Sequence, residues 1–210
     1  MTSLVLNTKA KMPPDQQQVY DFVTSCLDAV GADSLVVFGK QGRLEHDAYY
    51  EPLYLEYYYK DLVRRVPSVS VVEVELARYV DEHLDKCVKG FAEFPVVNFT
   101  FIAAPDTTVT LAENDVRFDL KYSLKFEKKS VRFNLDKFSV TQKIPLKRYL
   151  DMAEHTVSYY HAHKALDMNY FIEGDIPGRA YFHNSTLIIA VEDSSNQLLG
   201  QPYLFGFAVG

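Results

Sequence analysis

Hydrophobic positions recur every three or four residues in three segments of the chain, and this period predicts three helices. The first helix begins at Asp15, which is a suitable N-cap residue. Its apolar stripe consists of Val19, Phe22, Cys26 and Val30. The apolar run 35–38 continues this helix or begins a strand, and Gly39 is expected to end it.

The second and third helices have clearer boundaries. Ser70 and Glu73 have the spacing of a capping box, in which a hydroxyl and a carboxylate satisfy free backbone N–H groups of the first turn. The stripe behind them is made of Val72, Leu76, Val80, Leu84 and Cys87. Gly90 is expected to end this helix, whereas Pro145 opens the third helix, which ends near Lys164.

Between residues 95 and 144 the hydrophobic period changes to two, which predicts strands. The alternation is clearest over Val116, Phe118, Leu120, Tyr122, Leu124 and Phe126. Charged and polar residues lie between them, so we expect an antiparallel meander with one buried and one solvated face. Two more strands are expected over 179–193 and 203–210.

This order of elements indicates an α+β fold. We expect one twisted antiparallel sheet, made from residues 95–144 and 178–210, with about three helices packed on one face. Residues 16–210 are expected to form a single domain, and residues 1–15 a flexible N-terminal arm. The segment 40–67 is expected to contain short extended pieces joined by turns.

The composition is that of a globular, acidic chain. Of the 210 residues, 48% are hydrophobic and 24% are charged, which is enough apolar surface for a substantial core. The net charge of −6 repels a phosphate backbone, so no nucleic acid is expected as a partner. A membrane span needs roughly 18 consecutive apolar residues, and we expect no stretch of that kind in this chain. Membrane attachment would therefore require an anchor that is absent from this chain.

The segment HDAYYEPLYLEYYYKD, residues 46–61, is the most distinctive part of the sequence. Its tyrosines are Tyr49, Tyr50, Tyr54, Tyr57, Tyr58 and Tyr59. Burying all of them would require a hydrogen-bond partner for every hydroxyl, so about half are expected to face solvent. Tyrosine is enriched in recognition surfaces, and the acidic neighbours disfavour stacking on nucleic acid. The six are therefore candidate binding residues for a protein or a glycan, with an aromatic satellite core as the alternative.

No motif specifies a cofactor, a metal site or a catalytic group, and none of these is expected. On a helix, His161 and His163 would point about 200° apart, so they cannot share one ion. The sequence contains no HExxH or CxxC spacing and no GxSxG elbow. A hydrolase stays an alternative if its site is assembled from distant residues such as His46, His183 or the helix histidines.

The two cysteines, Cys26 and Cys87, bear on the compartment. An even number permits one disulfide, which would persist in an oxidising environment. Two buried, inert thiols in a cytoplasmic protein fit the composition slightly better. The residues alone leave both interpretations open.

Several motifs together resemble a group of predicted archaeal cell-envelope proteins. The segment QQQVYDFVTSCLDAVGADSLVVFGKQG is similar to a helix of that group that carries Y-V-x-x-C-L and runs into L-G-x-Q-G-G. A tyrosine-rich stretch, a helix like ELARYVDEHLDKC, strands and a final PYLFGFAVG follow in the same order over residues 16–210. Arg43 stands where that pattern prefers glycine. The resemblance implies an ectodomain with an N-terminal membrane anchor and carries no assigned activity.

With this resemblance, a Cys26–Cys87 disulfide between the first two helices is favoured over free thiols. The protein is then expected to be extracytoplasmic, at the cell surface, with a cytoplasmic location as the alternative. We expect a non-enzymatic binding or structural module that contacts an envelope protein or a glycan through its tyrosine tract. Self-assembly as a surface subunit is a further alternative, so homo-oligomerisation stays open.

Overall fold

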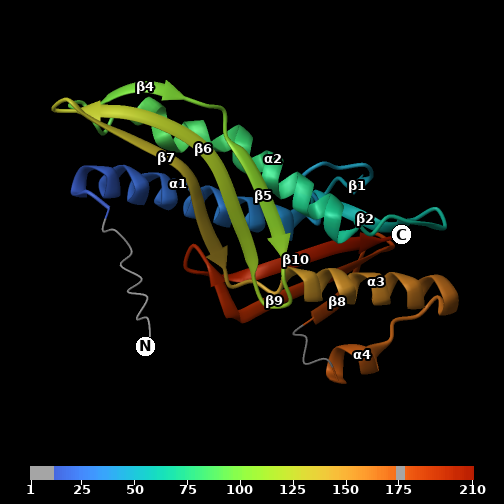
Figure 1. The fold of residues 1–210 in the computed structure, drawn as a ribbon. Helices are drawn as coiled ribbons and strands as arrows, with labels where there is room; N and C mark the ends of the chain where they lie inside the picture. Colours follow the sequence, from blue (N-terminus) through green and yellow to red (C-terminus); the bar gives the residue numbers. More distant parts are fainter. Residues whose placement is uncertain (1–11, 174–177) are drawn as a thin grey trace, which may run out of the picture.

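The computed structural model describes residues 12–173 and 178–210 and contains helices and two β-sheets (Figure 1). The α+β class is therefore confirmed. The arm expected over 1–15 lies mostly outside the described residues, and its last two residues already belong to a helix. The described elements are α1 (Pro14–Gln41), β1 (Tyr49–Tyr50), β2 (Leu55–Lys60), β3 (Val63–Arg64), α2 (Val69–Val88), the 3₁₀ turn η1 (Lys89–Phe91), β4 (Asn98–Ile102), β5 (Asp106–Leu111), β6 (Val116–Lys128), β7 (Val131–Gln142), α3 (Leu146–His163), α4 (Met168–Glu173), β8 (Gly178–His183), β9 (Thr186–Leu198) and β10 (Gln201–Val209).

Helix α1 is the central element, because it packs against α2, against β7 of one sheet and against β10 of the other. Its fully buried apolar side chains are Val19, Val23, Leu27, Leu35 and Phe38. By length and composition α1 is apolar enough to cross a membrane, contrary to the expectation that no such stretch exists. A helix surrounded by protein on several sides has the same composition, and half of that apolar window is buried inside this fold.

The C-terminal end of α1 corrects the expected helix boundary. The helix continues through Gly39 and ends at Gly42, which has φ 78° and donates its N–H to the Phe38 carbonyl oxygen over 2.7 Å. Gly39 has a different role: a Cβ atom there would lie 2.1 Å from the Leu204 carbonyl oxygen. The glycine therefore allows the helix backbone to approach strand β10 closely.

Helix α2 begins two residues before the position that the capping box indicates. Ser68 is the N-cap and accepts a hydrogen bond from the Val71 N–H, while Glu73 accepts one from Leu111 N–H in strand β5. The helix ends at Lys89, in the left-handed conformation, one residue before Gly90. The apolar stripe of the helix is buried as expected. Glu73 thus fixes the helix against the sheet instead of capping it.

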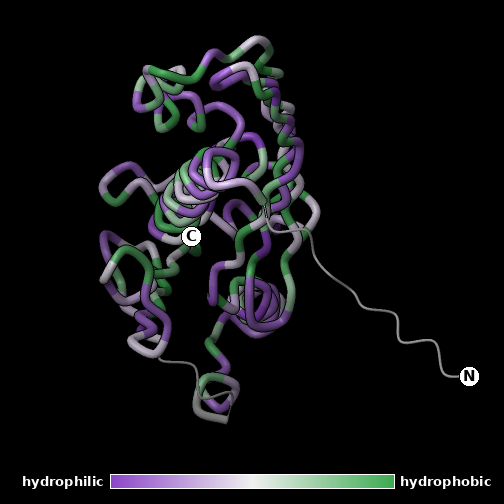
Figure 2. The backbone as a smooth tube through the Cα atoms, turned by 60° about the vertical axis from the view of Figure 1, so that its left-hand side comes forward, coloured by the Kyte–Doolittle hydropathy of each residue, from purple (hydrophilic) through white to green (hydrophobic). Residues whose placement is uncertain are grey.

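The four-stranded sheet confirms the alternation that predicted it. Strand β6 pairs with β7 along one edge and with β4 and β5 along the other, always antiparallel. Every second residue of β6, from Val116 to Phe126, is buried. Figure 2 shows the same alternation as hydrophilic and hydrophobic segments along these strands. Helices α1 and α2 contact this sheet and bury its apolar face.

The remaining strands form a second sheet, whereas one sheet was expected. Its order is β1-β2-β10-β9-β8, with β3 also paired to β2. Strands β2 and β10 run parallel and the other neighbours antiparallel. The tyrosine tract thus supplies β1 and β2, the short extended pieces expected between residues 40 and 67. Helix α3 packs on one face, where Tyr149 stacks on Tyr203 and Phe205.

A disulfide joins Cys26 of α1 to Cys87 of α2, with 5.7 Å between the two Cα atoms. This pairing confirms the bridge that the resemblance implied, between the two helices that were expected to carry it. The described residues contain no free cysteine. The bridge lies beside the apolar face of the four-stranded sheet and holds the two helices that cover it.

Candidate functional site

The tyrosine tract is mostly core, which corrects the expectation that its six residues form a binding surface. Tyr58 and Tyr59 are 0% and 2% exposed, and Tyr50 and Tyr57 are also buried. Strand β2 is interior to the sheet, and five consecutive side chains, which alternate between its two faces, are all buried. Only Tyr49 and Tyr54, at 41% and 63%, are exposed.

The buried hydroxyls find partners that lie far away in the sequence. Tyr58 donates to the Gly42 carbonyl oxygen over 2.6 Å. The Tyr57 hydroxyl lies 3.1 Å from Thr186 Oγ1, and the Tyr50 hydroxyl 2.5 Å from His183 Nδ1. Tyr59 accepts from Lys164 Nζ over 2.8 Å and also contacts His161. Burial raises the pKa of Tyr58 well above its ordinary value, so its hydroxyl stays a donor.

The two exposed tyrosines lie at the turn between β1 and β2. Their rings stack with an interplanar angle of 11° and 6.1 Å between centroids, and His46 packs on Tyr49. Below this turn, Glu56 is fully buried and accepts hydrogen bonds from the N–H groups of Asp47 and Ala48. The His46 Nδ1 atom lies 3.1 Å from the same carboxylate. Glu56 therefore fixes the position of the hairpin that carries Tyr49 and Tyr54.

A second buried carboxylate, Glu75, anchors the end of α1 to α2. The Arg43 guanidinium donates two hydrogen bonds to Glu75 Oε1, at 2.9 and 2.5 Å, and Leu44 N–H donates to Oε2. Burial alone would lower the pKa of Arg43, but the hydrogen bonds and the charge of Glu75 raise it above its ordinary value. Arg43, which departs from the glycine of the archaeal pattern, thus serves as a structural clamp.

The histidines named for a hydrolase do not converge. His46 contacts Glu56 and Gln41, whereas His183 contacts Tyr50, and the two histidines share neither of these partners. His161 contacts Tyr59 on α3, and within the described ranges no three acidic, histidine or cysteine residues are placed to hold a metal ion. Each of these three histidines instead contacts a different glutamate or tyrosine side chain.

One concave feature of the described residues is a trough on the face of the six-stranded sheet opposite α3. Another hollow, of about 400 Å³, lies on the four-stranded sheet beside Tyr20. Directly paired residues share a face, and the registers Leu204↔Glu192, Gly206↔Ala190 and Ala208↔Ile188 define the face of the trough. Strand β8 adds Arg179 beside Ala190 and Tyr181 beside Ile188. We call this feature the outer-face trough. Small residues form part of its floor, because Gly206 and Ala190 are paired side by side.

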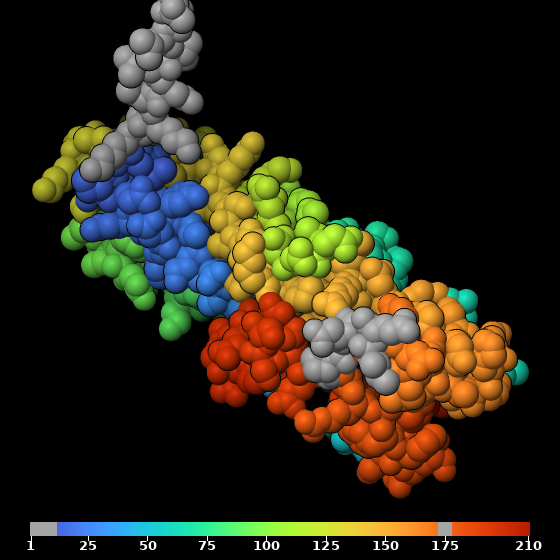
Figure 3. All heavy atoms as spheres, turned by 90° about the horizontal axis from the view of Figure 1, so that it is seen from below, coloured from blue at the N-terminus to red at the C-terminus, as the bar shows by residue number. Residues whose placement is uncertain are grey.

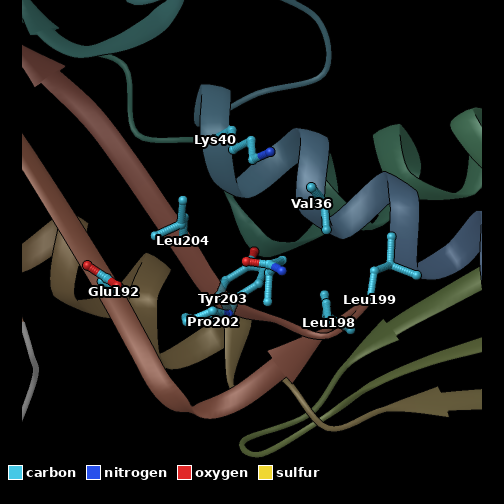
Figure 4. A pocket seen from close by; sticks show the side chains of 9 residues that line it. Val36, Lys40, Glu192, Leu198, Leu199, Pro202, Tyr203 and Leu204 are labelled. Atoms are coloured by element: carbon cyan, nitrogen blue, oxygen red, sulfur yellow. The ribbon is translucent and has the colours of Figure 1, made fainter.

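The trough consists of two adjoining hollows. One has a volume of about 380 Å³ and is walled by Leu53, Leu55 and Tyr181. The other, about 360 Å³, lies between α1 and the β9–β10 hairpin and is walled by Val36 and Leu199. Its residues converge from the helix above and the strands below (Figure 4). Both volumes fall within the range of ligand sites, which are lined mainly by apolar side chains.

The two hollows share Lys40, Glu192 and Leu204, so they adjoin each other at these residues. Figure 3 views the molecule from the side where the C-terminal strands, in red, meet the N-terminal helix, in blue. Lys40, Glu192 and Arg179 are exposed. Over residues 12–173 and 178–210, none of these three charges takes part in an ion pair. Within these ranges, all three charged side chains are exposed beside the trough.

Sequence reasoning did not select the residues of the trough. Leu53 and Leu55 lie inside the tyrosine tract, but the sequence indicated its tyrosines as the candidate binding residues. A pattern that could have indicated the trough is the strand segment Leu187–Val191, which has apolar residues on both faces. The strand next to it carries a glycine, Gly206. A strand that is apolar on both faces is covered on one face by the core and presents an apolar surface on the other.

No protein-family model, no curated protein and no solved structure matches this chain. Its function is therefore inferred from the geometry and chemistry of its own residues.

Proposed function

We propose that this chain is a non-enzymatic binding module whose ligand occupies the outer-face trough. The observation that carries the proposal is a mainly apolar trough of two adjoining hollows with exposed walls: Tyr181 is 47% exposed, Leu204 41% and Leu53 39%. A contiguous apolar surface with a few convergent charges is typical of a binding site. The floor comes from paired strands, and the walls come from a helix end, strands and two turns that join paired strands, so most of the site is held by regular elements.

The tyrosine tract keeps a reduced part in this proposal. Leu53 is a wall of the trough and immediately precedes Tyr54, whose ring stacks on Tyr49. The exposed pair therefore extends the contact surface beyond the trough at the β1–β2 turn. The buried tyrosines act indirectly, because the hydrogen bonds of Tyr50 and Tyr57 join β1 to β8 and β2 to β9.

We further propose an extracytoplasmic location. The disulfide is compatible with an oxidising compartment, since such bridges are rare in reducing cytoplasm. The resemblance to archaeal envelope proteins supports a cell-surface position and an envelope protein as partner, with attachment through an N-terminal anchor. An apolar helix near the N-terminus, α1, is equally compatible with this location, although it belongs to the core of the fold.

The binding proposal is tested with backbone amide NMR spectra of the intact protein. Three probe sets are titrated: short peptides, neutral and acidic oligosaccharides, and oleate. We expect one set to shift the amide signals of Ala190, Leu204 and Gly206 together, because these residues form the floor and centre of the trough.

A matched pair of variants decides whether the shifts report binding in the trough. Ala190→Trp places a large ring on the floor and is expected to abolish them. Val74→Trp, at a position of α2 that is 66% exposed, is the control and is expected to leave them unchanged. Melting temperatures verify that both variants fold. Shifts that are absent with every probe, or that survive Ala190→Trp, would contradict the proposal.

A further inference from the structure

The charges of the outer-face trough lie between two apolar ends. At one end the side chains are Val36, Leu198, Leu199 and Pro202. At the other end they are Leu53, Leu55, Tyr181 and Ile188. The residues common to both hollows are Lys40, Glu192 and Leu204, and Arg179 stands beside Ala190 just past this centre. The sequence of surfaces along the trough is therefore apolar, charged, apolar.

From this layout, and resting on the proposed binding function, we propose that the trough binds an extended peptide segment with an acidic side chain between two apolar ones. Among the described residues that line the two hollows, the two cationic groups of Lys40 and Arg179 outnumber the one carboxylate, that of Glu192. The local charge is thus positive on a chain whose net charge is −6. An acidic side chain of the ligand is attracted here and repelled by most of the remaining surface.

The spacing of the trough fits an extended peptide. Residues of β10 that face the trough, Pro202, Leu204 and Gly206, follow one another at every second position. An extended chain rises about 3.3 Å per residue, so Pro202 and Gly206 are about 13 Å apart. A ligand strand lying along β10 has its own alternate side chains at the same interval. Its first side chain then lies beside Pro202 and its third beside Leu204 at the charged centre. Its fifth lies at Gly206, where Leu55 of the other apolar end is the nearest side chain.

Other ligand classes match this layout less well. A fatty acid carries its charge at one end of an apolar chain, whereas the trough has its cations in the middle. A glycan is recognised through many hydrogen-bonding side chains, and the two ends of this trough are lined by aliphatic groups and one tyrosine. A peptide ligand also gives Glu192 a partner, because the Glu192 carboxylate can accept a hydrogen bond from a backbone N–H of the ligand.

Fluorescence anisotropy with two labelled peptides tests the inference. The acidic probe has the sequence Leu-Thr-Glu-Thr-Leu and the basic probe Leu-Thr-Lys-Thr-Leu, both with blocked ends. We expect the acidic probe to bind about tenfold more tightly than the basic one at low salt. The difference is expected to shrink as salt is added, since both cations are exposed.

Charge reversal in the trough provides the decisive comparison. The double variant Lys40→Glu with Arg179→Glu is expected to reverse the preference, so that the basic probe binds more tightly. The control, Lys121→Glu with Lys137→Glu, makes the same change of net charge on the four-stranded sheet, where the two residues pair across β6 and β7. It is expected to keep the original preference. A preference that does not reverse, or two probes that bind equally, would overturn the inference.

The outcomes separate this inference from the function on which it rests. If oleate or an oligosaccharide shifts the amide signals of the trough and neither peptide binds, the peptide assignment is overturned. The proposed binding function is then still supported. If no probe shifts these amide signals, both the binding function and the peptide assignment are contradicted.

Discussion

At the scale of single residues, the buried tyrosines differ in how their hydroxyls are satisfied. Tyr58 and Tyr203 are both almost fully buried and close to the end of α1. The Tyr58 hydroxyl donates to a backbone carbonyl, whereas that of Tyr203 has no hydrogen-bond partner among the described residues. A buried polar group without a partner costs free energy, and a paired one contributes modestly.

We therefore predict opposite effects when the two hydroxyls are removed. Tyr203→Phe is expected to leave the free energy of unfolding unchanged or to raise it by about 1 kcal/mol, because an unpaired polar atom is lost. Tyr58→Phe is expected to lower it by about 1–2 kcal/mol, since the Gly42 carbonyl oxygen loses its donor. Urea denaturation of both variants measures the difference. A clear loss of stability in Tyr203→Phe would show that its hydroxyl is in fact bonded.

At the scale of elements, the close contact between α1 and β10 depends on one glycine. Gly39 lies inside the helix, where alanine would ordinarily be favoured by about 1 kcal/mol. Here a Cβ would collide with the Leu204 carbonyl oxygen, and backbone atoms cannot move aside cheaply. The same contact positions Lys40 over the trough. Gly39 therefore contributes both to the stability of the fold and to the geometry of the candidate site.

Gly39→Ala is accordingly predicted to destabilise the protein by about 2–4 kcal/mol, despite the better helix propensity of alanine. Gly31→Ala is the matched control in the same helix. Its Cβ would meet only the ring of Phe118, at 3.3 Å, so an effect within about 1 kcal/mol of either sign is expected. Thermal or urea unfolding compares the two. Equal effects would mean that the helix end can shift away from β10 at little cost.

Elements with a one-sided pattern could be predicted from the sequence, and those buried on both sides could not. Strand β6 alternates because it has one apolar and one solvated face, so its period of two is visible in the sequence. Strand β2 is buried at five consecutive positions, and a run of tyrosines without alternation gives no period to detect. Its parallel partner, β10, lies at the far end of the chain, so local patterns carried no information on the pairing.

The candidate site was missed for a related reason. The tyrosine hydroxyls were judged too numerous to be satisfied, but their partners, such as Thr186 and His183, come from a distant hairpin. The trough in turn is assembled from α1, the β1–β2 turn and four strands, β2, β8, β9 and β10. Its residue types are ordinary in the sequence, and only their arrangement is distinctive.

At the scale of the whole molecule, the disulfide links the two helices that cover the four-stranded sheet. The sequence separation of its cysteines is 61 residues. On the chain-entropy model, closing a loop of this length stabilises the folded state by about 4 kcal/mol. That contribution is large compared with the marginal stability of most domains.

Replacing both cysteines, with Cys26→Ala and Cys87→Ala, is therefore predicted to lower the free energy of unfolding by about 4 kcal/mol. Reduction of the unaltered protein with dithiothreitol is expected to have a similar effect, and denaturant titration measures both. The same bridge should be intact in protein taken from its native cells and trapped with an alkylating reagent. Free thiols in that sample would contradict the extracytoplasmic location.

The parallel pairing of β2 with β10 has a consequence for the kinetics of folding. Tyr57 lies beside Ala208, so this contact joins positions separated by more than half of the chain. Contacts between such distant positions form slowly, because a long loop must close before any interaction rewards it. Until then the apolar strand β2 has an unpaired edge, which is a hazard for aggregation. Refolding from denaturant is thus expected to be slow, and its yield to fall as the protein concentration rises.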